Sequence, residues 1–355
     1  MSGGERWDRG LWLLGGGLSL ISLIALRSAS ATLNPALAMQ QAVWVGLGML
    51  VCVVAGSVSY LKWLECVMIL YGVAVSSLLV VLVAGTVKLG ASRWIQVGAL
   101  SVQPSELAKF VTVCSLARYL SSQPTPLPAK SVMLSGVLAG LPAALTFLQP
   151  DLGTSTIFVA SWCGAVWAAG LSRRHLAVMS VAALGLVPLG WHVLREYQRT
   201  RLLVFLNPQI DPLGAGYTII QSKIAIGSGQ LWGRGWMAGT QNQLNFLPER
   251  HADFLFSVIG EEWGWLGAMA VVLLFSALLW RAGEIALRHS EPQGRLLAIG
   301  VMSWIGYQAI VNMGMVMGLL PVVGVPLPLV SYGGSAMVTT WLALGVLQSI
   351  HRFCT

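Results

Sequence analysis

Long hydrophobic runs, separated by short clusters of arginine, proline and glycine, extend along the whole chain. Many of them approach the roughly 20 residues that an α-helix needs to cross a lipid bilayer. Strands of an outer-membrane barrel would alternate polar and apolar residues, and these runs do not alternate. The pattern predicts ten membrane-spanning helices, at residues 11–26, 43–59, 63–84, 107–120, 132–148, 154–171, 176–193, 254–279, 296–319 and 337–350.

Composition supports this class of protein. Hydrophobic residues make up 56% of the chain and charged residues only 10%, and the mean hydropathy is +0.74. A soluble globule of this composition would have too little polar surface to cover its core. The sequence therefore predicts an all-α integral membrane protein, with residues 1–355 forming a single polytopic domain.

Basic residues in the short loops predict the orientation, because cytoplasmic loops carry an excess of lysine and arginine. Loops on one side contain Arg6, Arg9, Lys62, Arg118, Lys130, Arg173, Arg174, Arg281, Arg288, Arg295 and Arg352. The opposite short loops contain Arg27, Lys88 and Arg93. Both termini are thus predicted to be cytoplasmic. The net charge of +8 follows from this asymmetry, and no nucleic-acid recognition motif accompanies it.

Residues 194–253 form a large extracytoplasmic loop between the seventh and eighth predicted helices. Loops of this length are usually functional or disordered. This one mixes β-branched and aromatic residues with glycine turns, so it lacks the polar bias of a disordered segment. It contains more cations than acids: Arg195, Arg199, Arg201, Lys223, Arg234 and Arg250 against Glu196, Asp211, Glu249 and Asp253. A basic outer surface suits an anionic ligand such as a phosphate.

Charged residues also occur within predicted helices, where lipid would make them costly. Glu106 and Lys109 are three residues apart and can pair on one helix face, although Glu106 can equally act as a cap at the positive end of the helix dipole. Asp151 is expected to cap the helix that follows it. Glu261 and Glu262 are expected to take buried hydrogen bonds, with a second acid-base role as the alternative.

Five motifs follow one another along the chain: QPSELAKF, QPDLGTS, IIQSKIAIGSGQLWGRGW, FLPERHADF and GLLPVVGVPLPLVSYGGSA. In this order they resemble the SEDS family of peptidoglycan polymerases (shape, elongation, division and sporulation proteins) over nearly the whole chain. FLPERHADF and VVGVPLPLVSYGG look more like elongation members than division members. The chain departs from the family pattern at Ala252, where threonine is frequent, and at Ala336, where a second serine is frequent. Neither departure removes a charged group.

The resemblance implies a ten-helix glycosyltransferase of the bacterial inner membrane. Such an enzyme joins the disaccharide-peptide units of Lipid II into a growing glycan strand during elongation and releases undecaprenyl pyrophosphate. It implies Asp253 as the catalytic residue and makes Glu106 with Lys109 a candidate coupling element between membrane core and active site. It also implies a class B penicillin-binding protein, the matching transpeptidase, and the elongation machinery as partners.

The residues themselves are compatible with this chemistry. Sugar transfer to a hydroxyl needs a base for the acceptor proton, which Asp253 can supply, and stabilisation of the departing pyrophosphate. The candidates for that stabilisation are Lys223 and Arg250, which lie in the most family-like loop motifs, and Arg199, Arg201 and Arg234. Anchoring to lipid headgroups is the alternative role for each cation. A metal-binding DxD motif is absent, which fits a lipid-linked donor, but a divalent cation (Mg²⁺ or Mn²⁺) on its pyrophosphate stays open.

Three other functions remain open. A flippase for a lipid-linked precursor also fits intramembrane charge and glycine-interrupted helices, although the chain has no second half related to the first. A division-type polymerase of the same family is a further alternative, and a scaffold would not need Asp253. Purified protein supplied with Lipid II separates polymerase, flippase and scaffold, through strand products, translocation without products, or neither.

Overall fold

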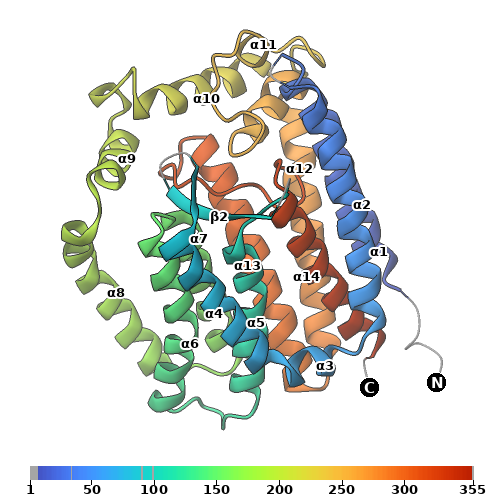
Figure 1. Ribbon diagram of the computed structural model, residues 1–355, viewed down its shortest axis with the longest axis vertical. Helices are drawn as coiled ribbons and strands as arrows, with labels where there is room; N and C mark the ends of the chain where they lie inside the picture. The colour runs from blue at the N-terminus through green and yellow to red at the C-terminus, as the bar shows by residue number, and fades with distance from the viewer. Residues whose placement is uncertain (1–6, 33, 89–90, 98–99, 354–355) are drawn as a thin grey trace.

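The computed structural model describes residues 7–32, 34–88, 91–97 and 100–353, which are predominantly helical (Figure 1). Its long helices are α1 (Arg9–Ala29), α2 (Ala36–Ser57), α4 (Val67–Ala84), α5 (Pro104–Ser121), α6 (Ala129–Leu148), α7 (Leu152–Ala168), α8 (Arg173–Val193), α12 (Leu255–Arg288), α13 (Pro292–Val316) and α14 (Gly334–Arg352). Shorter ones are α3 (Tyr60–Glu65), α9 (Glu196–Leu206), η1 (Pro208–Ile210), α10 (Ala215–Gly229) and α11 (Thr240–Gln243). The strands are β1 (Thr86–Lys88), β2 (Ala91–Val97) and β3 (Leu100–Val102).

Each of the ten predicted spans coincides with one of the long helices, and the all-α membrane class is confirmed. Among the described residues, five helices are long and apolar enough to cross a membrane by themselves, namely α1, α2, α6, α12 and α13. Helix α5 does not reach that standard because it contains polar residues such as Glu106, Lys109 and Thr112, which are buried inside the protein. The count of ten crossings stays a prediction.

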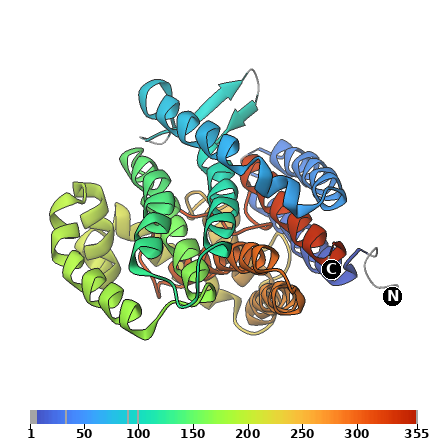
Figure 2. The same ribbon diagram turned by 90° about the horizontal axis from the view of Figure 1, so that it is seen from below.

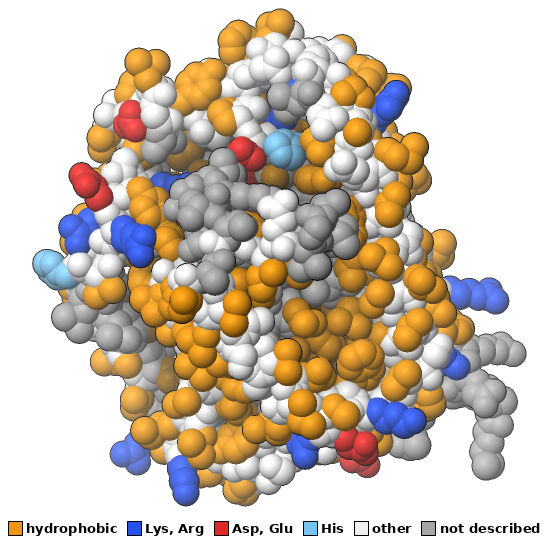
Figure 3. All heavy atoms as spheres, viewed as in Figure 1, with side chains coloured by type: hydrophobic (Ala, Val, Ile, Leu, Met, Phe, Trp, Pro, Cys, Tyr) orange, Lys and Arg blue, Asp and Glu red, His pale blue; other side chains and the backbone are white. Residues whose placement is uncertain are grey.

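The core lies among α5, α13 and α14. Phe110, Trp304 and Trp341 are fully buried there, and the view from below shows the blue N-terminal helices and the yellow-green α8 on opposite sides of the bundle (Figure 2). Hydrophobic side chains cover much of the visible surface, whereas lysine and arginine lie along its lower edge, at its left and right margins and near its top (Figure 3). This distribution fits a multi-pass protein whose apolar belt faces lipid.

Residues 194–253 contain more regular structure than their mixed pattern suggested. Helices α9, α10 and α11 lie at the end of the molecule away from the chain termini (Figure 1). Helix α10 is fixed to the bundle by Ser222, whose Oγ donates to the Val316 carbonyl (2.5 Å) and lies 2.8 Å from Ser257 Oγ. The segment is thus a folded layer on α12 and α13 and not a free loop.

Residues 233–236 of this layer (GRGW) pack against a kink in α12 at Gly264. Gly264 has a φ of 67° inside the helix, which frees the Trp265 amide to donate to the Gln230 carbonyl (2.8 Å). A Cβ on Gly264 would lie 2.3 Å from the amide nitrogen of Gly233, and one on Gly233 would lie 2.2 Å from the Glu262 carbonyl. Only glycine at both positions allows the two backbones to approach this closely.

A small antiparallel sheet in the order β1-β2-β3 connects α4 to α5. From β2, Arg93 donates to the carbonyls of Gln149 (3.4 Å) and Pro150 and lies 3.7 Å from Asp151 Oδ1. The sheet is thereby tied to the turn between α6 and α7. The residues between α4 and α5 do not alternate clearly between apolar and polar, so the sequence did not predict these strands.

Candidate active site

Asp253 lies two residues before α12, at the junction between the 194–253 layer and the helical bundle. Asn312 of α13 holds its backbone, because Nδ2 of Asn312 donates to the Asp253 carbonyl (2.9 Å). The half-buried carboxylate itself has no hydrogen-bond or ion-pair partner among the described residues. It is therefore free to accept a proton from a bound molecule.

The segment between α13 and α14 forms the wall opposite this carboxylate. Gly324 lies there with a φ of +71°, and a Cβ on it would be 3.5 Å from Asp253 Oδ2 and 3.9 Å from Arg201 Nη1. Arg201 of α9 also donates to the Val322 carbonyl (3.4 Å). Gly324 thus leaves open the space between an acid and a cation that are far apart in sequence.

A narrow cleft of about 20 Å³ adjoins this space, and Arg93, Tyr197, Arg201 and Val322 are among the residues that line it. A wider hollow of about 410 Å³ lies against Tyr197 and Arg201 on α9. Ligand sites usually measure about 300 to 1,000 Å³. The narrow cleft is therefore too small for a ligand, whereas the wider hollow on α9 has a volume within this range.

The surroundings of Asp253 raise its pKa to about 6. Burial is the largest cause, and the negative charges of Glu249 and Asp151 act in the same direction, whereas Arg201 and Arg93 lower the pKa. The carboxyl is mostly ionised at neutral pH but is a stronger base than an ordinary aspartate. A pKa close to the working pH suits a general base.

Arg250, predicted to contact pyrophosphate, is 1% exposed. Its guanidinium donates to the Ala29 carbonyl (2.8 Å), the Asn242 carbonyl and Thr32 Oγ1 (2.5 Å). These partners join the end of α1 to the layer that precedes Asp253. The burial does not fit the predicted pyrophosphate contact and instead supports a structural role.

Two further predicted cations bind carbonyls at helix ends. Arg199 donates to the carbonyls of Trp191 (2.8 Å) and His192 (2.9 Å) in the last turn of α8. Arg234 Nε donates to the Ser228 carbonyl (3.4 Å) near the end of α10. Such carbonyls lack partners within their own helix, which explains why arginine is favoured here.

Lys223 is exposed on α10, and its side chain lies over Gly318 at the end of α13. A Cβ on Gly318 would be 2.0 Å from Lys223 Cε. Its amine has no hydrogen-bond or ion-pair partner in the part of the chain that the structure describes, so it remains available to an anion.

Glu106 and Lys109 form the predicted ion pair in the core, with Lys109 Nζ 2.9 Å from Glu106 Oε1. Lys109 also donates to Gln308 Oε1 (3.1 Å), and Thr339 Oγ1 donates to Glu106 Oε2 (3.2 Å). Both charged side chains are buried. Buried charges with this many partners join three helices, α5, α13 and α14.

Hydrogen bonds continue from this pair toward Asp253. Gln308 Nε2 donates to the Pro326 carbonyl (2.8 Å), and Asn312 Nδ2 donates to the carbonyls of Val325 (2.6 Å) and Asp253. The ion pair and the backbone of Asp253 are therefore both attached to the segment that carries Gly324. The coupling role of the pair stays a prediction.

The three acids given structural roles by sequence behave as expected. Asp151 caps α7 by accepting from the amide (3.1 Å) and hydroxyl (2.9 Å) of Thr154. Glu261 accepts from the Gln241 amide (2.8 Å) and the Asn242 amide (3.1 Å). Glu262 accepts from the Ser28 hydroxyl and from the Asn242 side chain (2.8 Å). All three carboxylates are buried.

Sequence reasoning missed Arg93, Asn312 and Gly324. Arg93 carried one usable signal, because a cation on the side predicted to be poor in lysine and arginine departs from the topological rule. Gly324 carried none, because glycine is common throughout the chain, and Asn312 carried only the signal of a polar side chain inside a predicted span. Their importance depends on contacts between segments that are distant in sequence.

The model of the family described as Cell cycle protein, which covers FtsW, RodA and SpoVE, matches residues 9–355. The chain belongs to this family, the SEDS proteins. The peptidoglycan glycosyltransferase MrdB of Escherichia coli is 44% identical over 79% of this chain and 76% of its own length. Stage V sporulation protein E of Bacillus subtilis is 35% identical over 89% of this chain and 87% of its own.

Solved structures of SEDS proteins share the fold. A structure described as showing coordination of polymerization and crosslinking by a peptidoglycan synthase complex is 33% identical and superposes with a TM-score of 0.85, with 98% of each chain covered. The rod shape determining protein RodA of Thermus thermophilus is 30% identical, with a TM-score of 0.75 and the same coverage of both chains. The architecture and the order of the motifs are therefore those of SEDS proteins.

Proposed function

We propose that this SEDS protein is a peptidoglycan glycosyltransferase that joins Lipid II units into glycan strands, with Asp253 as the general base. The observation that carries the assignment is the unpartnered carboxylate of Asp253, with a pKa of about 6, beside Arg201 and Arg93. Similarity to MrdB, itself a peptidoglycan glycosyltransferase, supports the reaction class. Its 44% identity exceeds the 33% to 38% of the probable FtsW relatives, which favours elongation over division.

In the proposed reaction, the acceptor hydroxyl of one unit gives its proton to Asp253 while its oxygen attacks the sugar carbon of the other. The new glycosidic bond forms as the bond from that carbon to the pyrophosphate oxygen breaks. The electron pair leaves on the pyrophosphate, which departs with its undecaprenyl chain. Arg201 and Arg93 are the cations whose charges act on Asp253, and guanidinium groups suit pyrophosphate oxygens. Lys223, exposed on α10, is a further candidate for this role.

A divalent cation at this site would take most of its ligands from the substrate. The described residues contain no group of three or more His, Cys, Asp or Glu side chains placed to hold a metal. Mg²⁺ commonly binds through one or two carboxylates together with substrate phosphates. Asp253 is the carboxylate of the site that is free to take part, whereas both oxygens of Asp151 already accept hydrogen bonds.

We further propose that both termini are cytoplasmic in the inner membrane and that the 194–253 layer is extracytoplasmic. The distribution of basic residues supports this orientation, and Figure 1 has both chain ends opposite α9, α10 and α11. A class B penicillin-binding protein of the elongation machinery is the proposed partner, by analogy with the synthase complex of the same fold. Co-purification with, or stimulation by, that transpeptidase checks the pairing.

The test of function is glycan synthesis from Lipid II by purified protein. Asp253→Asn should lower the rate at least ~100-fold, because the amide cannot accept the proton. Asp211→Asn is the matched control, since Asp211 is a partly exposed aspartate in the same layer and asparagine can keep the hydrogen bond that its carboxylate accepts from the Gly214 amide. Near-normal synthesis by Asp253→Asn would eliminate the assignment. Lipid II translocation in vesicles without strand products would instead support the flippase.

A further inference from the structure

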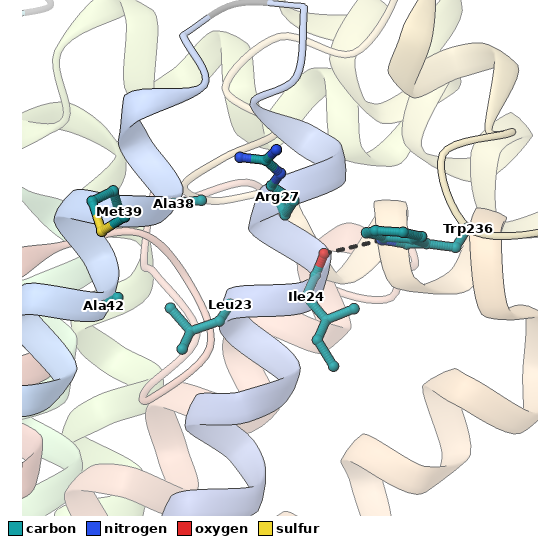
Figure 4. Close-up of a pocket in the computed structure, with 7 residues that line it drawn as sticks. All are labelled: Leu23, Ile24, Arg27, Ala38, Met39, Ala42 and Trp236. Atoms are coloured by element: carbon teal, nitrogen blue, oxygen red, sulfur yellow. Dashed lines mark hydrogen bonds between the residues drawn. The ribbon is translucent and has the colours of Figure 1, made fainter.

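An open groove of about 440 Å³ lies on α1 and α2, near the end of α1 and the start of α2 (Figure 4). Its volume falls within the range of small-molecule sites. It does not share a residue with the narrow cleft beside Asp253. The groove therefore needs an explanation of its own.

The walls of the groove are apolar. Leu23 and Ile24 come from α1, and Ala38, Met39 and Ala42 come from α2. Ala38 and Ala42 are four residues apart and so lie on one helix face, where two methyl groups leave a hollow between larger side chains. Met39 is 71% exposed. Such walls suit a hydrocarbon chain.

The outer end of the groove carries a free positive charge. Arg27 is exposed, and its guanidinium has no hydrogen-bond or ion-pair partner among the residues that the structure describes. Figure 4 shows it on α1, farther toward the end of that helix than Leu23 and Ile24. Arg27 is also one of the cations on the side that the topological rule expects to be poor in them. A guanidinium at the edge of an apolar groove complements an anionic lipid headgroup.

Trp236 forms the remaining side of the groove. Its indole Nε1 donates to the Ile24 carbonyl (3.2 Å), which fixes the ring although it is 52% exposed. The next residue is also anchored, because the Met237 amide donates to Glu262 Oε2 (3.2 Å). Tryptophan is enriched where membrane meets water, since its ring is apolar and its N–H is polar.

We propose that this groove binds an anionic glycerophospholipid, with the phosphate on Arg27 and an acyl chain along Leu23, Ala38 and Ala42. The lipid bridges α1, α2 and the layer that carries Trp236. Arg250 donates a hydrogen bond to the Ala29 carbonyl at the same end of α1. The bound lipid thus supports the frame on which the segment before Asp253 rests, and its binding does not depend on the reaction proposed for Asp253.

The test is native mass spectrometry of the full-length protein released from detergent with added lipids. Phosphatidylglycerol should be retained over phosphatidylcholine with the same acyl chains. Arg27→Gln should weaken phosphatidylglycerol retention roughly fivefold, the effect of about 1 kcal/mol for one cation near a membrane surface. Ala38→Phe fills the groove and should lower retention of both lipids. Arg195→Gln, which removes another exposed cation of the predicted outer side, should change nothing.

Three results would overturn the proposal. The first is equal retention of the two phospholipids by the unaltered protein. The second is unchanged phosphatidylglycerol retention in both Arg27→Gln and Ala38→Phe, each checked for normal thermal unfolding. The third is preferential retention of undecaprenyl phosphate, lost in Arg27→Gln, which would assign the groove to a polyprenyl lipid instead.

Discussion

Asp253 and the Glu261–Glu262 pair lie within nine residues of one another, yet they occupy opposite kinds of environment. The two glutamates are buried and accept hydrogen bonds from the 194–253 layer and from Ser28 of α1. Asp253 is half-buried, has no such partner in the described part of the chain, and has a raised pKa. Partnered acids hold the layer on the bundle, whereas the unpartnered acid is left to react.

The arginines of the 194–253 layer also differ from one another in what they contact. Arg199, Arg234 and Arg250 donate to backbone carbonyls, whereas Arg201 donates to the Val322 carbonyl and also faces the space beside Asp253. Residue type alone does not reveal function in this segment. Arg201 is distinguished by its position between the Val322 carbonyl and the open space next to Asp253.

The largest effect should be on thermal stability, when a buried glutamate that accepts hydrogen bonds is replaced. Glu262→Leu removes the acceptor of Ser28, Asn242 and Met237, and each buried donor left unsatisfied costs about 1 to 3 kcal/mol. We expect a large fall in the thermal unfolding temperature in detergent. Glu262→Gln, which keeps an acceptor oxygen, should lose less and should polymerise at a near-normal rate per folded molecule. A rate loss in Glu262→Gln as large as that of Asp253→Asn would erase the distinction between the acids.

Alanine substitutions at two glycines test whether the space beside Asp253 must stay open. Gly324→Ala places a methyl group between Asp253 and Arg201, and we expect a rate about tenfold lower, because small displacements of reacting groups are costly. Gly235→Ala is the control: its φ of +100° imposes comparable backbone strain, but its Cβ would meet only Ala238, at 3.7 Å. Equal rate losses in the two variants would attribute the effect to strain alone.

The fold was largely predictable because apolar runs long enough to span a membrane have few other solutions. The arrangement of the 194–253 layer was not, since its helices carry no clean apolar period and depend on contacts such as Gly233 against Gly264. Asp253 was identifiable only through its family motif. Arg93 and Asn312 could not be assigned, because a strand and a helix that are far apart in sequence bring them to the site.

The smallest expected effect is a gain in thermal stability when Asp253 is replaced by asparagine. The folded pKa of Asp253, about 6, is above the ordinary 3.8, so protonation stabilises the fold below about pH 3.8, and that contribution is lost as the pH rises through about 6. Asp253→Asn should therefore unfold at a slightly higher temperature than the unaltered protein at pH 7.5, with the difference fading toward pH 4. A lower unfolding temperature at pH 7.5 would show that the carboxylate has stabilising partners.

The most direct test of the central claim is the pH dependence of kcat/KM for glycan synthesis, measured for the unaltered protein and two charge variants. The rate should rise with pH through about 6 and then level off, because only ionised Asp253 accepts the proton. Glu249→Gln removes a charge that raises this pKa and should move the rise to lower pH, whereas Arg201→Gln removes one that lowers it and should move the rise to higher pH. Opposite shifts are the predicted result, even where Arg201→Gln also slows the reaction. A rise that stays at one pH in all three proteins would contradict Asp253 as the titrating base.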